Sequence, residues 1–342
     1  PVPPTTNAVL LLSAMYLLYH FKFGVKLILR MASKAVIKVS DLRKNFAKTK
    51  AVQGISFSVA KGSITAFLGP NGAGKTTTLE MLEGLLKPSG GTIEVLGFNP
   101  VKKPDEVKRR IGIQLQTANY YQFLRLKELL VLFASFYNRK VDADKLLNIV
   151  GLADKKNAYV DQLTGGQKQR FSIVSTLVND PQIIFLDEPT TGLDPQARRN
   201  LWEIIAEIKR QGKTIILTTH YMEEAQYLAD KIFIIDKGKI VAQGTTKQLI
   251  AQLPNPYRIE ITSAKKIKLE KLRALSGVIS STVATNTTGE YEYSLGTKNI
   301  HQTLPAVVKY LEKEKIAFED IAVAPSNLED VFLTLTGKEL RD

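Results

Sequence analysis

Residues 69–76 read G-P-N-G-A-G-K-T, and this segment constrains the fold more than any other part of the chain. It fits the phosphate-binding pattern G-x-x-x-x-G-K-[ST], which is meaningful when it lies between a strand and a helix. Residues 63–68 before it predict a buried strand, and residues 76–82 after it predict a helix. Glycines let backbone N–H groups approach a phosphate, and the start of a helix adds partial positive charge. The segment therefore predicts an α/β fold built around a phosphate-binding loop.

The loop taken alone could also be an ordinary glycine turn before a helix, but a second segment weighs against that reading. Residues 181–189 read P-Q-I-I-F-L-D-E-P, an apolar strand that ends in two carboxylates. Ligands bind at the carboxyl ends of parallel strands, so these acidic residues are expected near the loop. We expect Lys75 to reach terminal phosphates, Thr76 and Asp187 to bind Mg²⁺, and Glu188 to polarise an attacking water.

From residue 35 to about 253, predicted strands alternate with predicted helices. Apolar runs such as 183–186 and 214–217 are typical of strands buried on both faces of a parallel sheet. The strand pattern stops between 116 and 164, which predicts a helical insertion at about 117–170. Half-exposed strands are expected at 36–39, 55–59 and 92–96, and helices at 126–137 and 143–150.

The sequence Pro254-Asn255-Pro256 interrupts this alternation and predicts a linker. The order of elements after it is βαββαβ, the ferredoxin-like arrangement, followed by an amphipathic helix at 328–335. Strands are expected at 258–262, 279–284, 291–295 and 317–322, with helices at 269–275 and 300–313. We therefore expect three parts: an extension at 1–31, an α/β domain at 32–253 and a small α+β domain at 254–342.

Composition narrows the functional classes only partly. The chain has no cysteine, which excludes disulfides and thiolate metal sites, and 44% hydrophobic residues indicate a globular protein. Its net charge of +14 suits nucleic acid, anionic lipid or nucleotide, and equally a merely solvated surface. The apolar run at 8–19 is shorter than a membrane span. It is interpreted as an upstream extension of doubtful relevance before Met31, or alternatively as an interfacial anchor.

A third motif completes a recognisable set. Residues 163–167 read L-T-G-G-Q directly before a helix predicted at 168–179, and two glycines there present free N–H groups. The loop, this motif and the acidic strand end occur in the order typical of the ATP-binding cassette family, which the chain resembles from about 35 to 253. The resemblance implies a P-loop NTPase fold, an α/β cassette with a mixed, largely parallel sheet, and hydrolysis of ATP with Mg²⁺.

The resemblance also assigns roles to individual residues. Those implied in catalysis are Glu188, His220 and Lys75. Those implied in binding the metal are Thr76, Gln116 and Asp187. Those implied in binding nucleotide are Phe46, Gly69, Pro70, Asn71, Gly72, Ala73, Gly74, Lys75, Thr76, Thr77, Gln116, Thr164, Gly165, Gly166, Gln167 and Asp194. Two departures from the family are Thr164 in place of serine and Phe46 in place of tyrosine, and both keep the expected chemistry.

In the family, two cassettes dimerise head to tail and sandwich each ATP between the loop of one and the L-T-G-G-Q motif of the other. The resemblance therefore implies a second cassette, identical or different, and a polytopic membrane permease as partners. The tail at 327–333 resembles that of exporter cassettes, so a peripheral position on the cytoplasmic face of the membrane is expected. The alternative is a soluble cassette acting on ribosomes or nucleic acid, although no nucleic acid is expected here.

Other residues have simpler interpretations. Trp202 lies on a predicted amphipathic helix and is expected in the core. Arg198 and Arg199 are expected on a solvated face. Tyr120 and Tyr121 could pack within the helical insertion or contact a partner helix, and the sequence does not choose between these.

Overall fold

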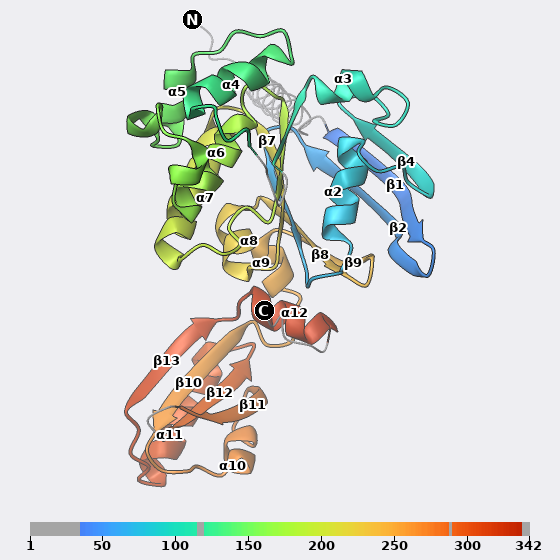
Figure 1. Ribbon diagram of the computed structural model, residues 1–342. Helices are drawn as coiled ribbons and strands as arrows, with labels where there is room; N and C mark the ends of the chain where they lie inside the picture. Colours follow the sequence, from blue (N-terminus) through green and yellow to red (C-terminus); the bar gives the residue numbers. More distant parts are fainter. Residues whose placement is uncertain (1–34, 115–119, 287–288, 337–342) are drawn as a thin grey trace, which may run out of the picture.

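The computed structural model describes residues 35–114, 120–286 and 289–336, and a six-stranded sheet forms its centre (Figure 1). The strand order is β5-β6-β7-β3-β8-β9, and neighbouring strands are parallel except for the antiparallel pair β8–β9. Their bounds are β3 Ile64–Leu68, β5 Ile111–Gln114, β6 Ile183–Asp187, β7 Thr214–Thr219, β8 Lys231–Asp236 and β9 Lys239–Gly244. The carboxyl ends of β3, β6 and β7 therefore meet at one edge, which is where the phosphate loop begins.

Both faces of this sheet are covered, which explains its apolar strands. Every residue of β3, β6 and β7 is buried. One face, with Leu186 and Leu217, packs against the helices α6, α7 and α8, while Phe185 on the other face packs toward α2. The helices of this part are α2 Lys75–Glu83, α3 Pro104–Lys108, α4 Leu126–Ser135, α5 Ala143–Ile149, α6 Gly165–Ser175, α7 Pro195–Arg210, α8 Met222–Leu228 and α9 Thr246–Ile250.

A three-stranded antiparallel sheet, in the order β2-β1-β4, encloses α2 from the far side. Its strands are β1 Ala35–Phe46, β2 Thr49–Ala60 and β4 Gly90–Val95. The half-exposed strands expected at 36–39, 55–59 and 92–96 lie here. The first two are 12 residues long because the polar ends of β1 and β2 continue to pair with each other.

The helical insertion agrees with the expectation in type but not in every boundary. Among the described residues between 120 and 164, the structure contains helices and no strand longer than a single bridge. Helix α4 ends at Ser135, two residues before the expected end. Helix α6 begins at Gly165 with Thr164 as its N-cap, so the L-T-G-G-Q motif forms the first turn of the helix and does not precede it.

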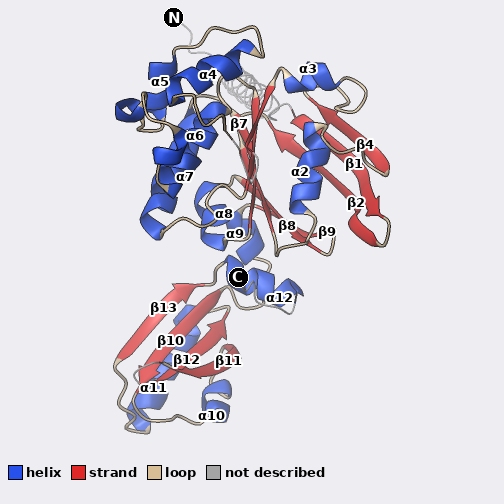
Figure 2. Cartoon of the chain, in the orientation of Figure 1, coloured by secondary structure: helices blue, strands red, loops and turns tan. Residues whose placement is uncertain are grey.

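The C-terminal part contains a four-stranded antiparallel sheet in the order β11-β12-β10-β13. Helices α10 and α11 cover one face of it (Figure 2). The elements are β10 Tyr257–Ser263, α10 Leu269–Arg273, β11 Val278–Thr285, β12 Tyr291–Thr297, α11 Ile300–Lys313 and β13 Asp320–Pro325. The predicted βαββαβ order is confirmed. The last strand begins three residues later than the expected 317–322, because Ile321 and Val323 pair with β10.

Helix α12, Leu328–Thr336, follows this sheet in the chain but packs elsewhere. Its buried residues Leu328, Val331 and Phe332 belong to the same core cluster as Leu228 of α8 and Leu249 of α9. The apolar face of the pattern at 328–335 therefore packs on the part of the molecule that contains the six-stranded sheet. Two expectations, the extension at 1–31 and the role of Gln116, concern residues outside the described ranges.

Candidate nucleotide-binding site

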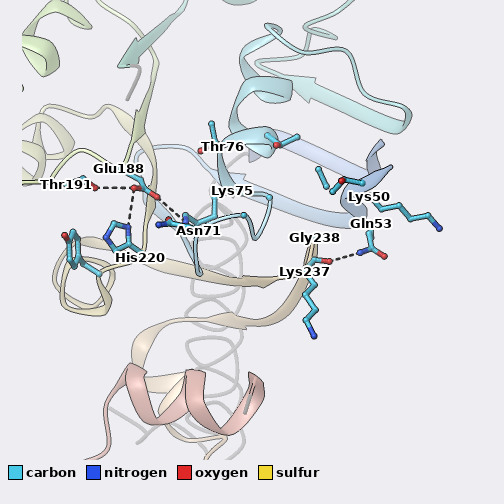
Figure 3. A pocket seen from close by; sticks show the side chains of 16 residues that line it. Lys50, Gln53, Asn71, Lys75, Thr76, Glu188, Thr191, His220, Lys237 and Gly238 are labelled. Atoms are coloured by element: carbon cyan, nitrogen blue, oxygen red, sulfur yellow. Dashed lines mark hydrogen bonds and ion pairs between the residues drawn. The ribbon is translucent and has the colours of Figure 1, made fainter. Parts of the chain in front are cut away.

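The loop between β3 and α2 opens onto a pocket of about 940 Å³ at the carboxyl edge of the six-stranded sheet (Figure 3). The loop and first helical turn contribute Asn71, Gly72, Gly74, Lys75, Thr76 and Thr77 to its lining. Glu188 and His220 enter from the ends of β6 and β7. The structure thus gathers all three predicted catalytic residues, Lys75, Glu188 and His220, around one cavity.

The loop conformation requires glycine at Gly74. This residue has φ of 101°, and a Cβ atom there would lie 2.4 Å from the carbonyl oxygen of Ala51. Gly72 also has positive φ, at 77°, but a Cβ atom there would meet nothing within 4 Å. Open space above a left-handed glycine allows backbone N–H groups to face a bound anion. The loop therefore has the form expected of a phosphate cradle.

Lys75 lies at the centre of the site and is almost completely buried. Its Nζ atom donates to the carbonyl oxygens of Gly69 at 2.9 Å and Pro70 at 3.2 Å. The same Nζ lies 3.2 Å from Oε1 of Glu188, and the two side chains are 4% and 8% exposed. With so little of either side chain exposed, each charge is compensated chiefly by the other rather than by water. The cation therefore faces the predicted catalytic carboxylate directly.

Glu188 makes contacts that favour its ionised form. Burial by itself would raise the pKa of Glu188, but Lys75 and His220 together hold this pKa below its usual value. His220 Nδ1 lies 3.3 Å from Oε2 of Glu188, and the Thr191 hydroxyl donates to the same oxygen at 3.2 Å. The backbone of Glu188 has φ of 47°, an uncommon value for a residue with a side chain. The carboxylate is thus fixed and charged, as a group that accepts a proton from water must be.

The predicted metal ligands Thr76 and Asp187 are brought together. The Thr76 hydroxyl donates to Oδ1 of Asp187 at 3.2 Å, and the Thr218 hydroxyl donates to the same atom. A hydroxyl and a carboxylate side by side, next to a phosphate loop, suit the hard oxygen-seeking Mg²⁺ ion. The donor set therefore fits the expected metal, with Gln116 lying outside the described residues.

Other predicted residues lie outside the lining of this pocket. Thr164 and Gln167 cap the start of α6, where each side chain bonds the backbone N–H of the other, at 3.4 and 3.0 Å. Gly165 and Gly166 form the first turn of α6, and Asp194 caps α7 by accepting from Ala197 N at 2.8 Å. Phe46 ends β1 with 44% of its surface exposed, and Lys44 Nζ lies 4.9 Å from its ring centroid. Ala73 is buried beneath the loop.

The structure adds lining residues that the sequence did not reveal. The turn between β8 and β9 supports the phosphate loop, because Gly238 N donates to Ala73 O at 2.9 Å. The Gln53 side chain on β2 fixes this turn by donating to Lys237 O at 2.7 Å (Figure 3). No local motif signals this turn, which lies more than 160 residues from the loop. Tyr221 and Thr191 could have been found from their neighbours His220 and Glu188.

The structure also bears on the simpler interpretations of Trp202, Arg198 and the two tyrosines. Trp202 is buried in the core, as expected. Arg198, expected on a solvated face, is half-buried with its guanidinium 3.9 Å from the ring centroid of Tyr221, so that expectation was wrong. Tyr120 packs against Phe171 with ring centroids 5.3 Å apart, whereas Tyr121 is exposed. Tyr120 therefore packs within the helical insertion, whereas contact of Tyr121 with a partner helix stays a prediction.

Comparison with known proteins places these features in a wider group. The family model of the ABC transporter matches residues 52–191. Nod factor export ATP-binding protein I of Paraburkholderia xenovorans is 37% identical over 317 residues, covering 90% of this chain and 99% of that protein. The daunorubicin/doxorubicin resistance ATP-binding protein DrrA of Streptomyces peucetius is 35% identical over 312 residues, covering 90% and 94%.

Solved structures agree with the fold. An ATP-binding subunit of an ABC transporter superposes with a TM-score of 0.58 at 30% identity, covering 64% of this chain and 92% of that one. A dimeric ATP-binding cassette in a post-hydrolysis state with ADP and phosphate gives a TM-score of 0.56 at 24% identity, covering 61% and 98%. Within the described part of this chain, no helix has the length and apolar character needed to span a membrane.

Proposed function

Because this chain belongs to the ABC transporter family, as an ATP-binding cassette that hydrolyses ATP, we propose that it is the ATPase subunit of an exporter and drives a separate membrane permease. The observation that carries the proposal is the buried group formed by Lys75, Glu188 and His220 beside the phosphate loop. The names of two relatives, one for Nod factor export and one for drug resistance, support the export direction.

Within the site, each side chain has a distinct task. Lys75 and the loop N–H groups bind and orient the terminal phosphates of ATP, while Thr76 and Asp187 would hold Mg²⁺. When bound, that ion neutralises charge on the phosphate oxygens. Glu188 accepts a proton from the attacking water because its carboxylate is ionised and fixed, and His220 orients that carboxylate.

Hydrolysis in this proposal requires a second cassette, of the same or another chain. The L-T-G-G-Q residues at the start of α6 and Asp194 at the start of α7 do not line the pocket of their own chain, and Thr164, Gly165 and Asp194 are exposed. They are therefore free to approach nucleotide bound in a partner, in a head-to-tail pair. A γ-phosphate bridging two surfaces would give ATP and ADP different affinities for the closed pair.

The permease would dock beside the helical insertion. A groove of about 450 Å³ lies between β5 and the helices α4 and α6, with Phe133, Phe136 and Tyr137 among its lining residues. Phe136 is 66% exposed and Phe123 nearby in the sequence is 89% exposed. Exposed aromatic side chains beside an apolar groove suit a partner helix. This arrangement supports a peripheral position at the cytoplasmic face of the membrane.

The domain boundaries belong to the same proposal. A cassette at 32–253, with its helical subdomain at about 117–170, would be followed by an accessory α+β domain at 254–342. The separate core cluster of the C-terminal sheet, including Ile259, Leu295 and Leu311, supports this division. Helix α12 lies in the accessory part of the sequence but packs on the cassette.

The experiment that tests this proposal identifies the proteins that bind the chain while it holds ATP that it cannot hydrolyse. Tagged Glu188→Gln protein is expressed in its native host, solubilised with ATP, and its co-purifying proteins are identified by mass spectrometry. A polytopic membrane protein is expected, and it should be absent or reduced with Lys75→Ala, which cannot hold nucleotide. Ribosomal proteins or nucleic acid in its place would reject the exporter and favour a soluble cassette.

A further inference from the structure

Glu224 is a buried acidic residue that the mechanism above does not use. It lies in the first turn of α8, four residues after His220, and its relative exposure is 0%. Its neighbour Glu223 in the same turn is exposed to solvent. A carboxyl group without access to water is costly in a protein core unless its hydrogen bonds compensate for lost hydration. The partners of Glu224 therefore indicate what the group is for.

Those partners come from different elements. Oε1 of Glu224 accepts from the Thr190 hydroxyl at 2.9 Å and from Nε1 of Trp202 at 3.1 Å. The Thr219 hydroxyl, a third donor, lowers the pKa of this carboxyl group, although Oε2 itself has no hydrogen-bond partner among the described residues. Burial raises the pKa of Glu224, and these three donors with the charge of Arg198 oppose that rise. One acceptor thus joins the loop after β6 and helix α7 to helix α8, which begins just after His220.

Two of the joined segments carry the catalytic pair. Thr190 lies two residues after Glu188, and the following Thr191 bonds the Glu188 carboxylate at 3.2 Å. Thr219 directly precedes His220, and its hydroxyl accepts from Tyr221 N at 2.9 Å, which fixes the turn around His220. A displacement between these segments would separate Glu188 from His220.

Helix α7, the third segment, begins next to residues that the proposed partner cassette would approach. Trp202 lies on α7, and that helix begins after Asp194, the residue proposed above to approach nucleotide bound in a partner cassette. Arg198 of the same helix stacks on Tyr221, whose ring centroid is 4.1 Å from that of His220. Helix α7 is therefore in contact with the His220 segment at two places, through Glu224 and through Tyr221.

From this juxtaposition, and resting on the proposed function, we propose that Glu224 is a positioning residue for ATP hydrolysis. Its carboxyl oxygen holds the Glu188 loop, the His220 turn and α7 in one arrangement. It does not touch nucleotide, because it does not line the pocket. Loss of this acceptor should therefore impair turnover and leave nucleotide binding intact.

The test compares Glu224→Leu, which removes the acceptor, with Glu224→Gln, which keeps a carbonyl oxygen of similar position. Glu223→Leu is the matched control on the solvent side of the same helical turn. We expect Glu224→Leu to lower kcat by about 10- to 100-fold and Glu224→Gln to retain most activity. Glu223→Leu should equal the unmodified chain. In a Glu188→Gln background, the Kd for ATP should change less than about twofold in all three.

Variants of the hydrogen-bond donors Thr190 and Trp202 test the proposal even if Glu224→Leu does not fold. Thr190→Val removes one hydrogen bond with little change of volume, and Trp202→Phe removes another while also shortening a buried ring; both should lower kcat with Kd unchanged. The NMR signals of the His220 ring provide a readout independent of activity, in a chain with only three histidines. They should shift in Thr190→Val and stay unchanged in Glu223→Leu.

Several results would overturn the inference. These are an unchanged kcat in both donor variants, a parallel loss of kcat and ATP affinity, or a Glu224→Gln protein as impaired as Glu224→Leu. If the unmodified chain hydrolysed no ATP, the proposed function would fall, whereas the His220 signals would still decide whether Glu224 holds that ring.

Discussion

At the scale of single residues, Lys75 and Glu188 depend on each other before any nucleotide arrives. Each is buried, and each neutralises the other across 3.2 Å. Removing one partner of such a pair leaves a poorly hydrated charge without its counter-charge, which costs more than the pair itself contributes. The residues that would act on ATP are therefore also residues on which the stability of the empty protein depends.

We predict that Lys75→Ala lowers the free energy of unfolding of the nucleotide-free protein by about 3 kcal/mol. The double variant Lys75→Met with Glu188→Gln should recover most of this loss, because no buried charge is then unpaired. Urea unfolding measures both. Lys38→Ala, which breaks the exposed pair with Glu94, is the control and should cost less than about 1 kcal/mol. Equal small effects of Lys75→Ala and Lys38→Ala would contradict the prediction.

At the scale of elements, α2 connects the phosphate loop to a second buried carboxyl group. Glu83 is the last residue of this helix and is 3% exposed. Burial, with smaller contributions from the charges of Asp187 and Glu80, raises the pKa of Glu83 from 4.5 to about 8. The folded protein therefore carries a proton there at neutral pH that the unfolded chain releases.

The consequence is a loss of stability as pH rises. Between pH 4.5 and about 8 the folded state binds one more proton at Glu83 than the unfolded state, so this group lowers stability by about 1.4 kcal/mol per pH unit. Glu83→Gln should therefore match the unmodified protein near pH 4.5 and become progressively more stable than it up to about pH 8. Denaturant unfolding in EDTA without nucleotide measures the difference, with Glu223→Gln at an exposed position of α8 as control. A constant difference across this range would refute the assignment.

The elements also show how much of the structure could be predicted from the sequence. The loop at 69–76 and the acidic end of β6 are local patterns, so both could be predicted with their neighbours. The start of β13 could not, because the segment 317–325 permits several registers and its pairing with β10 decides among them. Glu224 was missed for a similar reason, since two glutamates at the start of a helix ordinarily face solvent. Its burial depends on Thr190 and Trp202, which are distant in the sequence.

At the scale of the whole molecule, helix α12 joins the C-terminal part to the cassette. Phe332 is 2% exposed within the core cluster that also contains Leu228 and Leu249. We predict that Phe332→Ala lowers the free energy of unfolding by about 3–5 kcal/mol. Leu333→Ala, at a position 44% exposed on the same helix, should change it by less than about 0.5 kcal/mol. Thermal and urea unfolding of the full chain measure both, and equal effects would argue against this packing.

The path of the chain to α12 also sets an order of events during synthesis. Helix α9 leaves the ribosome roughly 80 residues before α12 does, a delay on the order of ten seconds at elongation rates of about 5–20 residues per second. During that interval the apolar surfaces of α8 and α9 against which α12 later packs are exposed to solvent. The nascent cassette would therefore have an exposed apolar patch until the intervening sheet and α12 have been translated. A chaperone that recognises apolar segments would bind the nascent chain at this patch during the interval.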